Sequence, residues 1–363
     1  MGAKVFILRS RGTIGLQNLK ERTMGTITHL HERLRPVPNR IDAEGDVLAA
    51  ASAVLPLLSQ LPVAEALSRS GLLPVSVPSD FGGLDVSNVV LAEAVSVIAA
   101  VSTKAAEALA SHCSSLEAIR NAGSEEQRRS AFARSAAGEC FRLLTGGGVA
   151  DLKTEARFLP EGMGFRLEGE VQATSEVDVD WLVLSVADPS GQSALLLVPR
   201  NAAGVELSQS REGASSLLRF AGVHVPADSV LALSRRQAGQ MMESVDRLLR
   251  AAAILGQARR ELESILAAID PERDATVASA HAIGWRQVEI ETVHALILRA
   301  ATAIDGAQVN PAAETIAQAC RTASVLSVAA QRMDTGRTAG EEEEAIVAAL
   351  GRLLIAGRDQ MTV

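Results

Sequence analysis

The spacing of apolar residues changes twice along the 363-residue chain, and these changes limit the fold more than any other feature of the sequence. From Ile41 to about Ala136, apolar side chains recur at steps of three and four residues, as at Leu48, Ala51 and Leu55. This is the period of one face of an α-helix. The first part of the chain is therefore predicted to be helical.

A period of two replaces the helical period from Gly138 onward. In GFRLEGEV the apolar residues Phe165, Leu167 and Val171 alternate with charged residues, which predicts a strand with one face in water. The runs WLVLSVA and SALLLVP are typical of buried strands, and the DPSG between them favours a turn. Residues 138–233 are therefore predicted to form a small antiparallel β domain.

Helical spacing returns from about Ser234. Helices are predicted over Leu248–Ala268, Pro311–Arg332 and Ala345–Gly357. One more helix should bury an apolar face formed by Trp285, Val288, Val293, Leu296, Ile297, Ala300 and Ile304. The chain thus divides into an extension (1–40), a helical domain (41–137), a β domain (138–233) and a helical bundle (234–363).

Charge and hydropathy exclude several classes of protein. The net charge of −8 and the pI near 5.4 oppose a nucleic-acid surface, which needs a concentrated positive patch. The longest apolar stretch, Val89–Val101, contains Glu93 and is too short to span a membrane. The start of the chain lacks a secretory signal pattern. A cytoplasmic protein without nucleic-acid or membrane partners is therefore expected.

The cysteines and the first histidines do not predict a metal centre. Cys113, Cys140 and Cys320 are widely spaced, which supports neither a disulfide framework nor a cysteine zinc site. His29 and His31 could chelate a metal, but no third ligand lies nearby in the sequence. We therefore expect these two histidines to be exposed and predict no metal site.

Three short motifs could carry chemistry, and each has a simpler structural explanation. His112 beside Cys113 suggests a nucleophile–base pair, but neighbouring residues on a helix point about 100° apart. The Gly-rich segment Thr145–Asp151 could cradle a phosphate, but it lacks a strand–loop–helix context. The acids Glu341–Glu344 could supply a carboxylate, although acids at a helix start more often stabilise the helix dipole. Spacing alone supports a helical–β–helical protein that binds a ligand.

The order of several segments resembles that of the acyl-CoA dehydrogenase superfamily. The segments are ALSRSGLLPVSVPSDFGG, AGSEEQRRSAFARSAAGE, RLEGE, VDWLVLSVAD, FAGVHVPADSVL and AAAILGQAR. More closely, the chain resembles the flavin-dependent monooxygenases typified by dibenzothiophene monooxygenase and the sulfur-acquisition oxidoreductases. This resemblance runs from about residue 45 to the end of the chain.

The resemblance implies an α+β, mostly α fold. Its parts would be an N-terminal helical domain, a central antiparallel β-barrel domain and a C-terminal four-helix bundle that builds a tetramer. A flavin would lie between the β domain and the bundle. The monooxygenase branch takes reduced FMN from a separate reductase and transfers one oxygen atom to a small organic substrate. The dehydrogenase branch keeps FAD instead.

The resemblance assigns roles to a few residues of this chain. His112, in ASHCSS, matches a histidine of the monooxygenase branch and is the candidate catalytic residue. Thr174 or Ser175 matches the small hydroxyl residue above the flavin. Arg273 is the candidate phosphate contact, and Arg358 matches an arginine of the terminal motif that faces the cofactor.

Other positions depart from the branch. Leu143 stands where a flavin-contacting asparagine is expected, and Val171 replaces a lysine, so neither side chain can form a hydrogen bond. The acidic residues Glu176, Asp178 and Asp180 crowd the same loop. Their charge opposes a reduced flavin, which is itself anionic.

The end of the chain leaves two functions open. The last two histidines of the branch motif fall on Gln360 and Val363, which cannot transfer protons near neutral pH. One function is a flavin-dependent oxidoreductase of the monooxygenase type, with FMN or FAD bound weakly or not at all and a flavin reductase as partner. The alternative is an inactive member of the fold that serves as a structural subunit or binding partner of an active paralogue. A true acyl-CoA dehydrogenase is disfavoured because no catalytic glutamate can be identified. Either way, a dimer or tetramer is expected.

Overall fold

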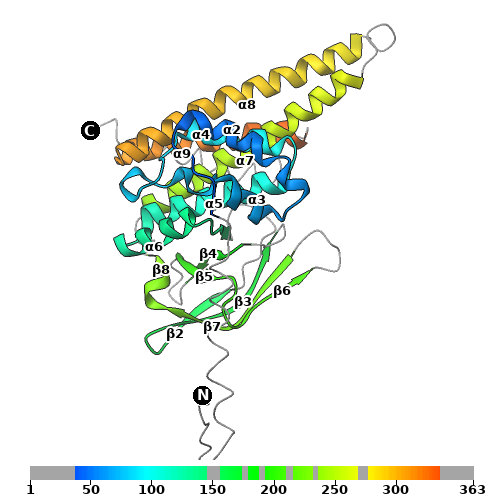
Figure 1. Ribbon diagram of the computed structural model, residues 1–363. Coiled ribbons are helices and arrows are strands. Elements are labelled where there is room, and N and C mark those ends of the chain that lie inside the picture. Colours follow the sequence, from blue (N-terminus) through cyan, green and yellow to red (C-terminus); the bar gives the residue numbers. More distant parts are fainter. Residues whose placement is uncertain are drawn as a thin grey trace, which may run out of the picture. The chain divides into compact units, whose positions relative to one another are not determined.

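The computed structural model describes residues 37–144, 156–173, 179–187, 193–209, 216–231, 236–268 and 277–335 (Figure 1). Contacts divide the chain into Met1–Val37 and Pro38–Val363. Everything below belongs to the second unit. Along it run helices, then strands, then three long helices, which is the order that the apolar spacing predicts. The domain boundaries themselves stay a prediction.

The described residues of the N-terminal part contain five α-helices. They are α2 (Val47–Val54), α3 (Val63–Ser70), α4 (Asn88–Ala99), α5 (Thr103–Ala122) and α6 (Glu125–Ala136). The 3-10 turn η1 (Glu44–Asp46) precedes α2, and η2 (Leu57–Ser59), η3 (Leu73–Ser76) and η4 (Ser79–Phe81) lie between α2 and α4. Local signals fix several ends. Gly71 ends α3 with φ of 80°, a conformation that favours glycine, and Ser124 with Gln127 forms a capping box at the start of α6.

The apolar face of α2 differs from the predicted one. Val47, Ala51 and Val54 are fully buried, whereas Leu48 is 36% exposed and Leu55 is half-buried. The three- and four-residue spacing is the same, but the face is rotated by one residue. The spacing alone could not tell these two faces apart, because both are apolar.

Eight strands of the described residues form one sheet in the middle of the chain. They are β1 (Phe141–Leu144), β2 (Arg157–Glu161), β3 (Gly164–Ala173), β4 (Trp181–Ala187), β5 (Ser193–Pro199), β6 (Val205–Gln209), β7 (Ser216–Pro226) and β8 (Val230–Leu231). Their order is β6-β7-β3-β2-β4-β5-β8, and β1 pairs with β4. The pairing is mostly antiparallel, as predicted, and the exceptions are β1 and β2, which both run parallel to β4. Closure of the sheet into a barrel stays a prediction.

The alternation predicted for β3 is confirmed. Leu167 and Val171 are buried, at 0% and 2% exposure, while the side chains of Arg166 and Glu168 reach solvent and pair with each other. The buried side chains join those of the neighbouring strands in a separate apolar core. The β part therefore has a core of its own, apart from the larger core of the helices.

Three long helices follow the sheet within the part of the chain that the structure describes. They are α7 (Arg236–Ala268), α8 (Val277–Val309) and α9 (Ala313–Thr335). Helix α7 contacts α4, α5, α8 and α9. Its Gly256 lies against α4, where an added Cβ would come within 2.1 Å of the Ser96 carbonyl oxygen, so this crossing requires glycine. The helix predicted over 345–357 lies outside the described residues.

The predicted buried face of α8 is right along most of its length and wrong at its start. Val293, Ile297, Ala300 and Ile304 are buried, but Trp285 is 58% and Val288 is 52% exposed. Trp285 and Val288 are exposed because of where the start of α8 lies. Figure 1 shows the end of α7 and the start of α8 running together beyond the other helices, which leaves few neighbours to cover these side chains.

Candidate functional site

Helix α5 carries an unusual run of buried polar side chains. They are Ser111, His112, Ser114, Ser115 and Glu117, and the thiol of Cys113 lies among them. The helix is enclosed because it contacts α3, α4, α7 and β1. Burying a polar group without a hydrogen bond costs free energy, so the partners of these side chains define what the helix holds in place.

His112 joins four elements through its ring. Its Nδ1 accepts a hydrogen bond from the backbone N–H of Phe141 at 2.9 Å, at the start of β1. Its Nε2 lies 3.0 Å from the carbonyl oxygen of Leu73 in η3 and 3.2 Å from Oγ of Ser135 in α6. Because Nδ1 accepts, the proton sits on Nε2 and is donated to Leu73. Both ring nitrogens are therefore occupied by protein groups.

The surroundings of His112 favour its neutral form. The side chain has no exposed surface. Burial lowers its pKa from 6.5 to about 4, and the hydrogen bond to the Leu73 carbonyl and the charge of Asp180 oppose this shift only in part. At neutral pH the ring is thus an uncharged connector with a fixed tautomer.

Ser111, one residue earlier, contacts the same strand. Its Oγ accepts a hydrogen bond from the backbone N–H of Leu143 at 2.9 Å and lies 3.4 Å from the carbonyl oxygen of that residue. The opposite edge of β1 pairs with β4, in a register that sets Phe141 beside Trp181. Side chains of a helix on one edge and a strand on the other therefore hold β1 in place.

The entry to β1 is fixed by polar and aromatic contacts. Asp180 accepts a hydrogen bond from the Cys140 backbone N–H at 2.8 Å. Trp181 stacks on Phe141 with ring centroids 6.1 Å apart, and its Nε1 donates to Glu139 at 2.6 Å. The carboxylate of Asp180, predicted to oppose a flavin, is thus directed at the protein's own backbone.

The next two residues of β1 are also buried. Arg142 is 8% exposed, and burial lowers the pKa of its guanidinium, an effect that the nearby Glu107 carboxylate opposes. Leu143 is 8% exposed and belongs to an apolar cluster that includes Leu116 and Val183. The strand therefore presents a cation on one face and an aliphatic side chain on the other.

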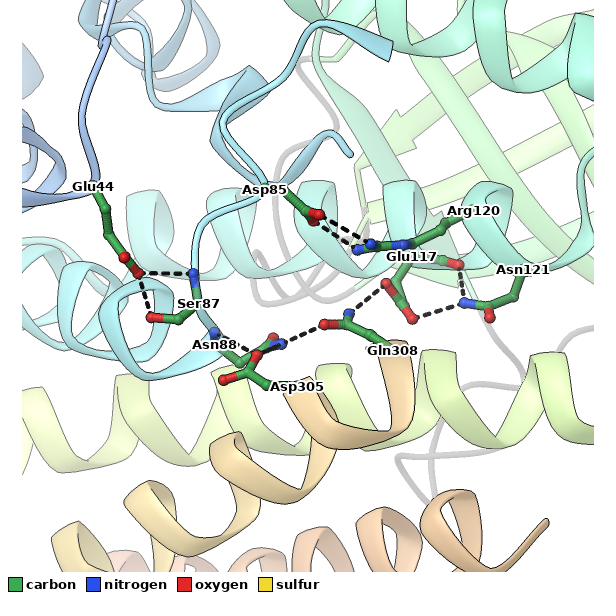
Figure 2. A network of polar contacts seen from close by, with 9 residues as sticks. All are labelled: Glu44, Asp85, Ser87, Asn88, Glu117, Arg120, Asn121, Asp305 and Gln308. Carbon is green, nitrogen blue, oxygen red and sulfur yellow. Dashed lines mark hydrogen bonds and ion pairs between the residues drawn. The ribbon is translucent and has the colours of Figure 1, made fainter. Parts of the chain in front are cut away.

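A second polar network ties α5 to α8 and to the start of α4 (Figure 2). Glu117 accepts hydrogen bonds from Nδ2 of Asn121 at 2.7 Å and from Nε2 of Gln308 at 2.9 Å. Gln308 in turn accepts from Asn88, whose Nδ2 and backbone N–H also donate to Asp305 at 2.6 and 2.9 Å. This chain of bonds joins residues that lie about two hundred positions apart in the sequence.

Glu117 is the buried acid of this network. Burial raises its pKa, while the charge of Arg120 and the bonds from Asn121 and Gln308 oppose the shift. A cavity of about 10 Å³ lies against Glu117, and Ser76 and Cys113 also line it. That volume is close to the minimum that holds one water molecule. Burial also raises the pKa of Cys113 to about 12, so this thiol is not a nucleophile at neutral pH.

The structure places only one of the predicted site residues. His112 is described, and its catalytic role stays a prediction because no substrate or cofactor contact tests it. Thr174, Ser175, Arg273 and Arg358 lie outside the described residues, so the structure does not show whether they meet.

Sequence reasoning missed Ser111 and Glu117, although a signal existed. The polar run SHCSSLE interrupts a helix otherwise rich in alanine and leucine. The other sequence hypotheses have plain outcomes. His29, His31 and the motifs 145–151 and 341–344 lie outside the described residues. Within the ranges that the structure describes, no cluster of three or more His, Cys, Asp or Glu side chains could hold a metal ion, and no helix is long and apolar enough to cross a membrane.

Comparison with known proteins identifies the fold. Residues 30–139 match the family model for the acyl-CoA dehydrogenase N-terminal domain. The fold is similar to that of FMN-bound dibenzothiophene monooxygenase TdsC from Paenibacillus sp. A11-2, with a TM-score of 0.67 and 20% identity over 86% of this chain and 89% of that one. The search of curated proteins gives no match.

Two further solved structures are similar. Methanesulfinate monooxygenase MsuC from Pseudomonas fluorescens has a TM-score of 0.66 and 20% identity over 86% of this chain and 87% of that one. A chain of the ChsE4–ChsE5 complex from Mycobacterium tuberculosis has a TM-score of 0.62 and 16% identity over 90% and 99%. The chain thus has the acyl-CoA dehydrogenase fold. The N-terminal part of the chain also matches the family model for the N-terminal domain of that fold.

Proposed function

We propose that the protein is a flavin-dependent oxidoreductase of the monooxygenase type, which uses reduced flavin and oxygen on a small organic substrate. The observation that supports this most is the fold, which covers most of the chain and is similar to that of an FMN-bound monooxygenase. The second monooxygenase of similar fold, MsuC, supports the same choice. At about 20% identity the specific substrate does not carry over.

The described residues limit how firmly a flavin is held. Of the positions that the resemblance sets against the flavin, Leu143 and Val171 are described, and both are buried aliphatic side chains at 8% and 2% exposure. Neither can donate a hydrogen bond to a flavin. These two positions do not fit the cofactor, so we derive no catalytic step through it. We propose instead that FMN or FAD binds in the micromolar range, because each lost bond of this kind is worth about 1–3 kcal/mol.

A second candidate function follows from the same misfit. Engagement of both ring nitrogens of His112 with the protein also favours a subunit without catalysis of its own, which assembles with an active paralogue. The similar chain in the ChsE4–ChsE5 complex belongs to an assembly of two different proteins. In this case the flavin site would form only when the partner is present.

One experiment separates the two functions. The purified chain is titrated with FMN and with FAD, and bound flavin is measured at equilibrium from the change in its visible absorbance. A flavin reductase and a panel of aromatic and sulfur-containing substrates then test for oxygen transfer. Micromolar binding with turnover supports the oxidoreductase. No flavin binding by the isolated chain contradicts the oxidoreductase and favours the subunit. Nanomolar binding would show that Leu143 and Val171 do not weaken flavin binding.

The terminal motif gives a second test. Replacing Gln360→His and Val363→His together restores the titratable pair of the branch, but we expect this change alone not to raise oxygen transfer, because Leu143 is unchanged. Strong turnover by the unmodified chain would show that the two histidines are dispensable.

A further inference from the structure

A cavity of about 550 Å³ lies between the turn η4 and the first half of α6. Its lining residues are Asp80, Phe81, Glu125, Arg128, Arg129 and Ala133. None of these six residues takes part in the hydrogen bonds of His112 or Glu117 described above. The volume lies within the range of natural small-molecule sites. The cavity therefore has room for a small ligand, and its lining indicates which kind.

Arg128 brings an unsatisfied cation to this cavity. Its half-buried guanidinium has neither a hydrogen bond nor an ion pair with the described residues, and its Nε is hidden from solvent as well. Its Cζ lies 5.7 Å from the centre of the Phe81 ring. Stacking on a ring uses the face of a guanidinium and leaves the N–H donors in its plane for an acceptor. Such an unsatisfied group calls for a partner, and a bound ligand is one.

The other charged residues of the lining decide which charge is left for a ligand. Glu125 and Arg129 pair with each other at 2.7 Å. Asp80, an exposed residue of η4, makes no ion pair within the described residues, although it lines the same cavity as Arg128. One carboxylate and one guanidinium, on two different elements, are therefore left for a ligand.

Local structure holds both walls of the cavity in place. The chain leaves η4 through Gly83, where an added Cβ would come within 2.0 Å of the Val77 carbonyl oxygen, so this turn requires glycine. On the other wall, Gln127 of α6 donates from Nε2 to the Val230 carbonyl oxygen at 3.1 Å, which ties the helix to the end of the sheet. Walls that are formed before binding lower the entropy cost of holding a ligand.

We propose that this cavity binds a small zwitterion with an apolar body, the chemistry of a free apolar amino acid. Its carboxylate pairs with Arg128, because a planar guanidinium matches the two oxygens of that group, and its ammonium group pairs with Asp80. The apolar body lies against Phe81 and Ala133. A simple anion fits less well, because its charge faces that of Asp80. This site does not depend on the proposed flavin function.

Calorimetric titration of the flavin-free protein with three matched probes tests the class of ligand. L-Phenylalanine carries both charges, 3-phenylpropionate lacks the ammonium group, and 2-phenylethylamine lacks the carboxylate. L-Phenylalanine should bind about tenfold more tightly than 2-phenylethylamine, because Arg128 is half-buried, and about threefold more tightly than 3-phenylpropionate, because Asp80 is exposed to water. No binding of L-phenylalanine, or equal affinity for all three probes, overturns the proposal.

Two substitutions locate the site. Arg128→Gln should weaken the binding of L-phenylalanine about tenfold and leave that of 2-phenylethylamine unchanged. Asp80→Asn should weaken the binding of L-phenylalanine about threefold and should not weaken that of 3-phenylpropionate. If Arg128→Gln binds L-phenylalanine as tightly as the parent does, the ligand lies elsewhere and the proposed site is wrong.

Arg134→Gln is the matched control. Arg134 is an arginine of the same helix that also lies over an aromatic ring, 4.6 Å from the centre of the Trp181 ring. Unlike Arg128, it is paired with an acid, Glu139, at 3.3 Å, and it does not line the cavity. Its substitution should leave the affinity for L-phenylalanine unchanged. An equal loss of affinity in Arg134→Gln and Arg128→Gln would show a general effect on α6 and overturn the pairing of the carboxylate with Arg128.

Discussion

At the scale of single residues, burial decides what His112 can do. A histidine in water titrates near pH 6.5, whereas this one has a pKa of about 4 and gives both nitrogens to protein partners. When the ring gains a proton, Nδ1 becomes a donor that faces the Phe141 N–H, another donor. Protonation therefore breaks the bond that holds the start of β1.

This predicts a dependence of stability on pH. Because the unfolded chain binds the proton more tightly, the contribution of His112 is complete above about pH 6.5 and is lost as the pH falls toward 4. The loss amounts to roughly 3 kcal/mol in the free energy of unfolding. In His112→Asn the rise in the free energy of unfolding between pH 4 and pH 6.5 should disappear. Urea unfolding at several pH values measures this. A slope equal to that of the parent would contradict the low pKa.

At the scale of elements, the network around Glu117 connects the last turns of α8 to α4 and α5. Two neutral amides, from Asn121 and Gln308, serve the carboxylate, and Arg120 is also paired with Asp85 at 3.1 Å. The attachment of α8 thus depends on a buried acid. Such groups are costly to bury charged and more costly to leave without partners.

Two substitutions at Glu117 should have opposite effects. The folded state raises the pKa of Glu117, so its contribution to stability is complete below the ordinary value of 4.5 and falls as the pH rises. Glu117→Gln should remove this fall and be at least as stable as the parent at pH 8. Glu117→Ala leaves the Nε2 group of Gln308 without this acceptor, while Asn121 keeps only its bond to the carbonyl oxygen of residue 117, so this change should cost about 1–3 kcal/mol. Glu126→Gln, at an exposed position on α6, is the control. A melting temperature of Glu117→Ala above that of Glu117→Gln would refute the network.

At the scale of the whole molecule, α8 bears apolar side chains around most of its circumference. One side packs in the core, yet Val288, Leu298 and Val309 are 52%, 42% and 88% exposed on the others. A helix that is apolar all round is normally covered, and exposed apolar patches mark association surfaces. This agrees with the dimer or tetramer expected from the sequence.

We therefore predict self-association through α8. Light scattering should give a dimer or tetramer at micromolar concentration, and Leu298→Arg should reduce the mass. Leu159→Arg, at a site 47% exposed in β2, is the matched control and should not change it. In Trp181→Phe, Trp285 is the only tryptophan, and its emission should shift to longer wavelength on dilution as the assembly separates. A monomer mass for the parent protein would refute the prediction.

Much of the architecture could be read from the sequence, because local patterns specify local structure. The period of two in β3, the stop at Gly71 and the helix starts after Ser102 and Ser124 depend on residues within one turn or strand of each other. The series of segments then indicated the superfamily. Leu48 and Trp285 could not be predicted correctly, because their exposure depends on which neighbours cover a face that is apolar on more than one side.

Only the tertiary structure decided what the buried polar residues do. The sequence marked His112 as a candidate catalytic residue, but the partners of its ring come from η3, α6 and β1. The partners of Glu117 include Gln308, 191 positions away. A sequence pattern records spacing within one element, whereas a buried hydrogen bond needs atoms from different elements within about 3 Å. That distance is fixed only when the helices and the sheet pack together.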